Sequence, residues 1–349
     1  MSGSLPGPGL SASRESLEPR PELVLRVRGL SVEVATASGR IEAVRGVGFE
    51  LRRGEAIGLV GESGSGKTLT CRAVLGALPA GCVLSGGTIE LDGVDLAALD
   101  RSGWTSVRST RVGAVFQDPA SYLNPSLPVG EQLAEVIRVK GGKRRAAARG
   151  RALELLATMH LHRPAHVYQQ IPAELSGGML QRVMIAIAVA CDPVLPVADE
   201  ATTALDLTTQ REVIDLLSEL RERLGLAVVF VSHDLAAVAE LCDRVAVFYA
   251  GEVVEIGDTV SVISAPSHPY TEALLRVGFL GSEEEAALEV IPGRHPRLGE
   301  AAAGCRFAPR CAHRRESCSR PLGLTPAPAG GRVRCLRSPE LALVGAELG

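Results

Sequence analysis

The chain has 349 residues, of which 46% are hydrophobic and 22% charged, and its formal net charge is −3. This length is sufficient for two compact units, each with a buried core. The slightly negative charge and the 3% of aromatic residues argue against nucleic acid as a partner. The longest apolar stretch, residues 183–191, has about half of the roughly 20 residues that cross a bilayer, so we expect no membrane span.

Residues 1–22 are rich in Pro, Ser and Gly and contain no apolar core followed by a cleavage site. We therefore expect a disordered tail rather than a secretory signal. A chain without such a signal is expected in the cytosol, where disulfides are rare. This matters for the eight cysteines of the chain.

The next segments alternate between strand and helix patterns. Residues 24–60 contain short β-branched runs broken by Gly, which predict an antiparallel layer that leads into a buried strand at 56–60. From Lys67 onward, the expected elements are helices and strands in turn: a helix after Lys67, a strand at 112–116, helical residues 126–170, a helix at 178–190, and strands at 194–199 and 226–232. This order predicts an α/β fold with a mixed, mainly parallel sheet and a helical insertion, which we place at about 120–185.

A glycine-rich loop follows the first buried strand. Its sequence GESGSGKT fits G-x-x-x-x-G-K-[ST] between a strand and a helix, and comprises Gly61, Glu62, Ser63, Gly64, Ser65, Gly66, Lys67 and Thr68. Glycines let backbone N–H groups turn inward around phosphates, and the helix N-terminus favours their negative charge. Lys67 is expected to reach the β and γ oxygens, and Thr68 to bind Mg²⁺.

An acidic pair ends the strand at 194–199. Asp199 is suited to hold Mg²⁺, and Glu200 to orient or deprotonate the attacking water. Pro196 interrupts this strand, and we expect it to remove one hydrogen-bond donor from the sheet at a cost of about 1–3 kcal/mol. The groups needed for hydrolysis are all present, so we expect the site to be active.

Further motifs show a family resemblance. LSGGMLQR (175–182) resembles the signature motif of ABC transporter ATPases, a family of P-loop NTPases. FQDP (116–119), TALD (203–206) and SHD (232–234) resemble the glutamine loop, the D-loop and the switch-histidine loop of the same family. The resemblance covers about residues 24–260, and we place the ATPase domain at 23–264. Departures occur at Ala201, where family members usually carry proline, at Val34, where they usually place an aromatic ring against adenine, and at Leu180, where a polar or basic residue is common.

This resemblance implies specific roles. Gln117 joins Mg²⁺ and senses the γ-phosphate, and His233 contacts the γ-phosphate. Ser176, Gly177 and Gly178 open a helix and make a second anion site, which acts on the nucleotide of another subunit. Asp206 crosses to that subunit. The implied active unit is a pair of ATPase subunits that enclose ATP between them.

Residues 265–349 differ in composition, with Pro, Arg and clustered Cys, and we expect a small separate module there. SHPYTEALL (267–275) and the segment 291–318 resemble the C-terminal extension of ABC ATPases that serve peptide importers and their nickel-importer relatives. The module carries four cysteines with the spacing C-x5-C-x6-C-x16-C: Cys305, Cys311, Cys318 and Cys335. Four cytosolic thiols suggest a metal. The resemblance implies a 4Fe-4S cluster, with zinc or free structural thiols as alternatives.

Several arginines surround these thiols: Arg306, Arg310, Arg314 and Arg315. They are suited to offset thiolate charge, and a solvated basic face is the alternative.

The resemblance implies an ATP-hydrolysing subunit of an importer for dipeptides or oligopeptides. It implies ATP, Mg²⁺ and the cluster as cofactors. The expected partners are a second ATPase subunit, which we expect to form a heterodimer, two membrane permease subunits and an external peptide-binding protein. We expect a peripheral location on the cytoplasmic face of the inner membrane. The alternatives are a nickel-chelate importer, a non-hydrolysing regulatory subunit, and a soluble ABC ATPase that acts on DNA or ribosomes.

Overall fold

The computed structural model describes residues 22–202, 205–279, 291–300 and 303–346. The predicted tail, residues 1–22, lies outside this part except for Glu22. Within the described chain, no helix is both long and apolar enough to span a bilayer.

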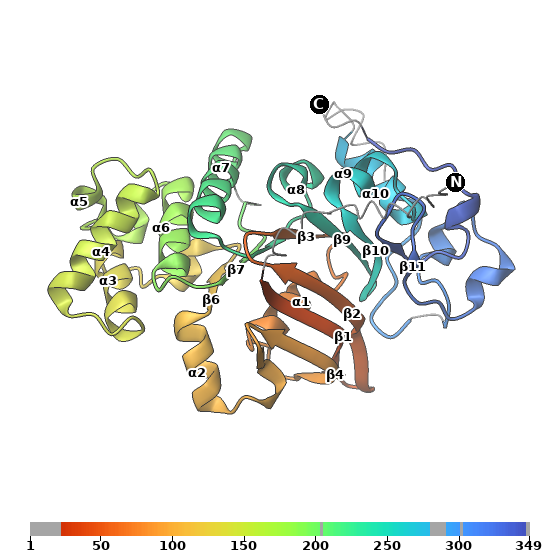
Figure 1. Ribbon diagram of the computed structural model, residues 1–349, viewed down its shortest axis with the longest axis horizontal. Coiled ribbons are helices and arrows are strands. Elements are labelled where there is room, and N and C mark those ends of the chain that lie inside the picture. The colour runs from red at the N-terminus through yellow and green to blue at the C-terminus, as the bar shows by residue number, and fades with distance from the viewer. Residues whose placement is uncertain (1–21, 203–204, 280–290, 301–302, 347–349) are drawn as a thin grey trace, which may run out of the picture.

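The centre of the molecule is an eight-stranded sheet in the order β11-β12-β10-β9-β3-β8-β7-β6 (Figure 1). Its strands are β3 (Ala56–Val60), β6 (Val112–Val115), β7 (Leu195–Asp199), β8 (Val228–Val231), β9 (Arg244–Tyr249), β10 (Glu252–Asp258), β11 (Thr325–Pro326) and β12 (Arg332–Val333). The run from β9 to β6 is parallel, whereas β10, β12 and β11 are antiparallel to their neighbours. The predicted mixed, mainly parallel sheet is confirmed.

Both faces of this sheet are buried, as the apolar strands require. In β3, Ile57 and Leu59 belong to one hydrophobic cluster, while Ala56 and Val60 belong to another. Since successive side chains of a strand point to opposite faces, an uninterrupted apolar run fits a strand with packing on both sides.

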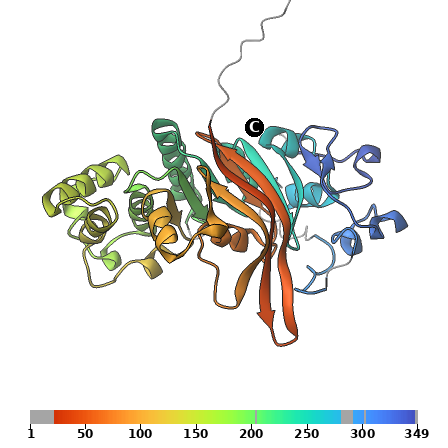
Figure 2. The ribbon, with the colours of Figure 1, turned by 60° about the horizontal axis from the view of Figure 1, so that its bottom comes forward.

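The predicted antiparallel layer is a four-stranded sheet in the order β2-β1-β4-β5. Its strands are β1 (Leu23–Thr36), β2 (Gly39–Arg52), β4 (Cys82–Leu91) and β5 (Val94–Asp95), followed by the 3₁₀ turn η1 (Leu96–Ala98). Figure 2 shows the long β1–β2 hairpin in front of the central sheet. Its buried side chains, such as Leu25, Leu30 and Val44, join the cluster that also receives Ile57 and Leu59.

Helices pack on the central sheet: α1 (Lys67–Val74), α2 (Arg101–Thr110), α7 (Leu207–Leu224) and α8 (Leu235–Leu241). Helix α7 begins at the N-cap residue Asp206 and ends at Gly225, which has a φ of 62°. A C-terminal glycine in the left-handed conformation is a common way to end a helix.

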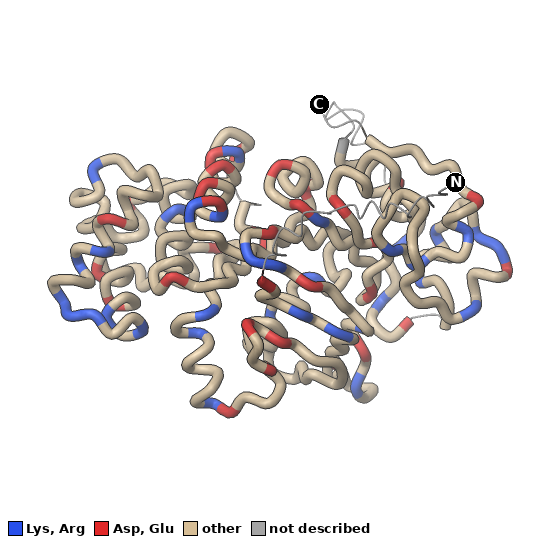
Figure 3. Tube along the Cα trace, viewed as in Figure 1, with Lys and Arg blue, Asp and Glu red and all other residues tan. Residues whose placement is uncertain are grey.

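The helical insertion lies on one side of the molecule, at the left of Figure 1. It contains η2 (Pro119–Tyr122), α3 (Val129–Val139), α4 (Arg145–Thr158), α5 (Pro164–Val167), η3 (Pro172–Glu174) and α6 (Gly177–Val189). Leu133, Ile137, Leu155 and Leu156 are buried between these helices. Figure 3 shows several Lys and Arg at the outer end of this insertion, and Arg outnumbers Asp and Glu in residues 303–346.

The C-terminal segment lies on the opposite side (Figure 1). It contains α9 (Thr259–Ser264), α10 (Pro269–Phe279), η4 (Ala308–Arg310), η5 (Glu316–Ser319) and η6 (Ser338–Glu340). We expected a small separate module at residues 265–349; in the structure, β12 of this segment pairs with β10 and extends the central sheet. Pairing the edge of β10 in this way satisfies backbone groups that would otherwise be exposed at the edge.

Pro196 lies near the start of β7, where the sheet tolerates it. The ladder between β7 and β8 begins at Val197. The N–H of Leu195 points to the other neighbour, since it donates to the Arg111 carbonyl oxygen over 3.1 Å. The missing donor of Pro196 therefore faces β8, between the bond that the Ala227 N–H donates to the Val194 carbonyl oxygen over 3.1 Å and the ladder that begins at Val197. Proline thus removes one donor from the sheet near the start of the strand.

Candidate functional site: a phosphate loop and its acidic partners

The phosphate loop, residues 61–68, connects β3 to α1. Gly61, Gly64 and Gly66 have φ angles of 139°, 77° and 105°, which other residues rarely adopt. A Cβ atom on Gly61 would lie 2.1 Å from the Phe248 carbonyl oxygen. Position 61 therefore requires glycine, because a side chain would strain the backbone and would clash with Phe248. The loop forms a backbone cradle at the N-terminus of α1.

Lys67 is turned back onto this loop. Its Nζ atom donates to the carbonyl oxygens of Gly61 over 2.7 Å and Glu62 over 3.0 Å. Burial lowers the pKa of Lys67, while the negative charges of Glu200 and Asp199 act in the opposite direction. The ammonium group of Lys67 therefore lies within the cradle, where the negative charges of Asp199 and Glu200 stabilise its charged form.

Thr68 and Asp199 meet beside the loop. The Thr68 hydroxyl donates to Asp199 Oδ1 over 3.3 Å, and Asp199 is buried at the end of β7. Burial raises the pKa of Asp199, and the hydrogen bond from Thr68 lowers it. A hydroxyl and a carboxylate are hard oxygen ligands of the kind Mg²⁺ prefers, and a cation would favour the charged carboxylate.

The remaining predicted catalytic residues follow the ends of neighbouring parallel strands. Glu200 follows β7, has a φ of 53°, and donates its backbone N–H to the Val231 carbonyl oxygen over 3.1 Å. His233 follows β8 and Gln117 follows β6, and both side chains are exposed. Because the carboxyl ends of parallel strands lie at one edge of a sheet, these residues border the same edge as the phosphate loop.

The predicted second anion site lies at a different place. Ser176 is the N-cap of α6, and its Oγ accepts from the Met179 N–H over 3.3 Å. Ser176 and Gly178 line a cleft together with Thr209, and none of the described residues that line it belongs to the phosphate loop. In one copy of the chain, the helix start at Ser176 and the phosphate loop therefore belong to separate places on the molecule.

Asp206 is the N-cap of α7, where its carboxylate accepts from the Thr209 N–H over 3.0 Å and from the Thr209 hydroxyl over 2.7 Å. These hydrogen bonds lower the pKa of Asp206. Thr203 and Ala204, the first half of the predicted D-loop, lie outside the described residues. Gly177 and Gly178 form the first turn of α6, and a Cβ atom on Gly178 would lie 2.4 Å from the Thr209 side chain.

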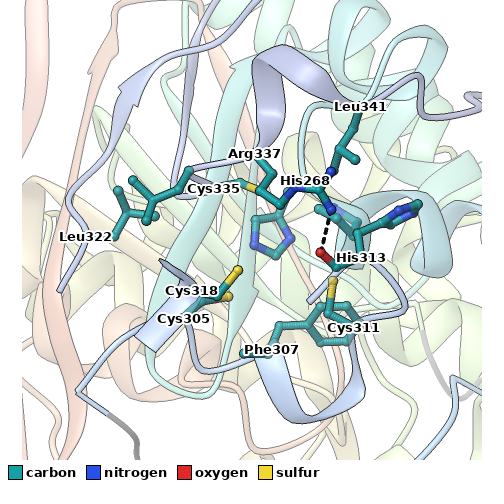
Figure 4. Close-up of a pocket in the computed structure, with 13 residues that line it drawn as sticks. His268, Cys305, Phe307, Cys311, His313, Cys318, Leu322, Cys335, Arg337 and Leu341 are labelled. Carbon is teal, nitrogen blue, oxygen red and sulfur yellow. Dashed lines mark hydrogen bonds between the residues drawn. The ribbon is translucent and has the colours of Figure 1, made fainter. Parts of the chain in front are cut away.

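The four clustered cysteines line one cavity, which His268 and Phe307 also border (Figure 4). Burial raises the pKa of Cys305 to about 11 and also raises those of Cys311 and Cys335. Among the described residues, no group of three or more Cys, His, Asp or Glu is arranged to hold a single metal ion. The structure thus brings the thiols together around one space without forming a mononuclear metal site.

Two arginines of this region have other partners than the expected thiolates. Arg310 forms an ion pair with Glu62 of the phosphate loop, with an N–O distance of 2.7 Å. Arg306 pairs with Glu252 at 3.5 Å. Sequence analysis missed the Arg310–Glu62 pair, because 248 residues separate the partners and no local pattern connects them.

Comparison with known proteins agrees with this geometry. The family model "ABC transporter" matches residues 44–203, and the model "Oligopeptide/dipeptide transporter, C-terminal region" matches residues 254–318. The oligopeptide transport ATP-binding protein OppD of Bacillus subtilis (strain 168) is 40% identical, with 83% of this chain and 82% of the relative aligned. The dipeptide transport ATP-binding protein DppD of Escherichia coli (strain K12) is also 40% identical, with 84% and 90% aligned.

Solved structures show the same fold. A dimeric post-hydrolysis state of the ATP-binding cassette MJ0796, bound to ADP and Pi, has a TM-score of 0.61 and 29% identity, and the match covers 67% of this chain and 98% of that one. The structure of cbiO1 from Clostridium perfringens has a TM-score of 0.61 and 25% identity, with 77% and 100% covered. The phosphate loop, the acidic pair and these relationships together show that the chain belongs to the ABC ATPases, in the family of peptide-import ATP-binding proteins.

Proposed function

We propose that the chain is the ATP-hydrolysing subunit of an importer for dipeptides or oligopeptides, and that it couples ATP binding and hydrolysis to uptake through partner membrane subunits. The contact between Thr68 and Asp199 beside the glycine-rich loop supports the ATPase role most directly. The cargo class rests on similarity to OppD and DppD and on the match of residues 254–318 to the oligopeptide/dipeptide C-terminal region.

In the proposed mechanism, the N–H groups of the phosphate loop and Lys67 hold the phosphates of ATP. Thr68, Asp199 and Gln117 would hold Mg²⁺, which supplies charge neutralisation on the phosphoryl oxygens. Glu200 orients and deprotonates the attacking water, and His233 contacts the γ-phosphate. The position of these residues at one edge of the sheet supports this assignment.

The active unit is proposed to be a pair of ATPase subunits. The cleft at Ser176 and the phosphate loop are separate in one chain, so a second subunit is needed to bring Ser176–Gly178 to a bound triphosphate. We propose a heterodimer with a related ATPase, in which Asp206 contacts the other subunit. The assembly includes two permease subunits and an external peptide-binding protein, and the chain lies on the cytoplasmic face of the inner membrane.

Phosphate release by the assembled transporter tests the proposal. Glu200→Gln is expected to lower the rate by about 100-fold or more, since a general base contributes about 10²–10⁴-fold. Glu240→Gln, an exposed carboxylate that pairs with Arg211, is the matched control and is expected to retain the wild-type rate. Near-zero rates in both wild type and Glu200→Gln would instead identify a non-hydrolysing regulatory subunit.

Cargo is tested by uptake into vesicles that contain the complete transporter. Peptide uptake that depends on ATP supports the proposal, whereas uptake of a nickel chelate without peptide uptake would favour the nickel-importer alternative.

We further propose that the four cysteines hold a 4Fe-4S cluster. In such a cluster four thiolates bind the iron atoms of one cubane, so its sulfur ligands need not converge on a single ion. His268 supports the fit: it is buried, its Nδ1 accepts from the Tyr270 N–H over 3.0 Å, and its Nε2 has no hydrogen-bond partner among the described residues. The neutral ring therefore carries its proton on Nε2, at the border of the cavity.

When bound, the cluster would hold the four sulfur atoms as thiolates and crosslink the C-terminal segment. Iron and acid-labile sulfide after anaerobic purification test this proposal, with an expected four of each per chain. Stoichiometric zinc without iron would refute it, and Cys82→Ser, which changes an isolated cysteine, is the control that should leave the content unchanged.

A further inference from the structure

The C-terminal segment forms hydrogen bonds and an ion pair with Glu62 of the phosphate loop. Tyr270 of α10 accepts a hydrogen bond from the Glu62 N–H at its hydroxyl oxygen, over 2.8 Å. Arg310 of η4 binds the Glu62 carboxylate with both terminal nitrogens, over 2.7 and 3.1 Å. Two residues more than 200 positions away in sequence thus bind the backbone N–H and the carboxylate of Glu62.

Arg310 is held in one geometry. Its side chain is 4% exposed, and all five of its guanidinium N–H groups have acceptors. Besides the carboxylate, these acceptors are the carbonyl oxygens of Ile291 and Pro292 and the Tyr249 hydroxyl. The group also lies 5.8 Å from the Tyr249 ring centre and 5.9 Å from that of Phe307. Such a fully paired, stacked arginine has little freedom to move.

The position of Glu62 makes this pair relevant to nucleotide binding. Lys67 Nζ donates to the Glu62 carbonyl oxygen over 3.0 Å, so Glu62 is linked directly to the residue that is to hold the phosphates. A carboxylate next to a triphosphate repels it, and a partner with the opposite charge removes most of that repulsion. Arg310 supplies this charge from outside the loop.

We propose that Arg310 and Tyr270 are positioning residues for nucleotide binding, which hold Glu62 in place and neutralise its carboxylate, so that full ATP affinity requires the C-terminal segment. This inference rests on the ATP-binding role of the phosphate loop. It gives the C-terminal segment a role at the nucleotide site.

The test is titration of the full-length chain with MgATP and MgADP, measured by calorimetry. Arg310→Gln leaves Glu62 unpaired and is expected to weaken both affinities about tenfold. Glu62→Gln removes the repelling charge, so it is expected to bind both nucleotides at least as tightly as wild type. The double variant Glu62→Gln/Arg310→Gln should recover to within about threefold of wild type. Tyr270→Phe, which loses only the acceptor, is expected to weaken binding about threefold.

A purely structural role predicts a different pattern, in which both single changes weaken binding and the double variant is weaker than either. That pattern, or wild-type affinity in Arg310→Gln, would overturn the proposal. Arg310→Lys, which keeps the charge but cannot form the bidentate pair, should weaken binding less than Arg310→Gln does, and it provides the comparison if Arg310→Gln does not fold.

Two further variants separate this inference from the proposed function. Arg315→Gln breaks an exposed pair with Glu340 in the same segment and should bind like wild type. Lys67→Ala should abolish detectable binding. If Lys67→Ala binds ATP like wild type, the phosphate loop does not bind ATP and the proposed function is refuted. If Lys67→Ala weakens binding and Arg310→Gln does not, the phosphate loop binds ATP but the inference about Arg310 is refuted.

Discussion

Thr68 and Asp199 are 131 residues apart in sequence, yet the Thr68 hydroxyl donates to the Asp199 carboxylate over 3.3 Å. Thr68 lies in the first turn of α1 and Asp199 ends β7, and the parallel sheet brings the two elements together at one edge. The contact joins the phosphate-binding part of the site to its acidic part.

This contact gives a first prediction. Thr68→Val removes the hydroxyl, so the Mg²⁺ concentration for half-maximal phosphate release by the assembled transporter should rise about tenfold or more, whereas Thr68→Ser should remain near wild type. Equal Mg²⁺ dependence in Thr68→Val and Thr68→Ser would rule out Thr68 as a ligand.

The separation of the Ser176 cleft from the phosphate loop gives a second prediction. Ser176→Arg should leave the MgATP affinity of the isolated full-length chain within about twofold of wild type, but should slow phosphate release by the assembled transporter at least about tenfold. Thr105→Arg on the exposed surface of α2 is the control. Weaker binding by the isolated Ser176→Arg chain would show that the cleft acts within its own subunit.

The close contact between β6 and α6 gives a prediction about stability. A Cβ atom on Gly113 would lie 2.2 Å from the Ala188 carbonyl oxygen, so Gly113→Ala should lower the free energy of unfolding by about 1–3 kcal/mol. Gly150→Ala in α4 has open space around it and should raise that free energy by about 0.5–1 kcal/mol. Urea unfolding of both variants measures the difference, and a loss in both would contradict the steric explanation.

Glu255 gives a prediction about pH. This buried residue accepts from the backbone N–H groups of Ser267 and His268, and burial raises its pKa from 4.5 to about 7. The folded chain binds the proton more tightly than the unfolded chain does, so stability falls as pH rises from about 4.5 to 7. The shift corresponds to about 3 kcal/mol.

Glu255→Gln does not titrate and provides the comparison. Relative to this variant, wild type should lose about 3 kcal/mol in the free energy of unfolding between pH 4 and pH 8, as measured by urea unfolding. A constant difference between the two chains across this range would show that the Glu255 carboxyl does not titrate with a raised pKa.

The motifs predicted most of the site because their chemistry is local. A glycine-rich loop between a strand and a helix must form a cradle at the helix N-terminus, and Gly61, Gly64 and Gly66 have the φ angles that this requires. The same holds for Ser176 and Asp206, whose side chains cap the helices that follow them. The effect of Pro196 was harder to judge, because it depends on where the neighbouring ladder begins.

The amino-acid sequence by itself determined the α/β order, the phosphate loop, the acidic pair and the family, since each depends on residues that are adjacent or regularly spaced. Only the tertiary structure decided that β12 extends the central sheet, that four thiols border one cavity, and that Arg310 pairs with Glu62. These contacts join segments that are far apart in the chain. Packing and charge in three dimensions select the partners, and neither produces a periodic pattern along the sequence from which the pairing could be predicted.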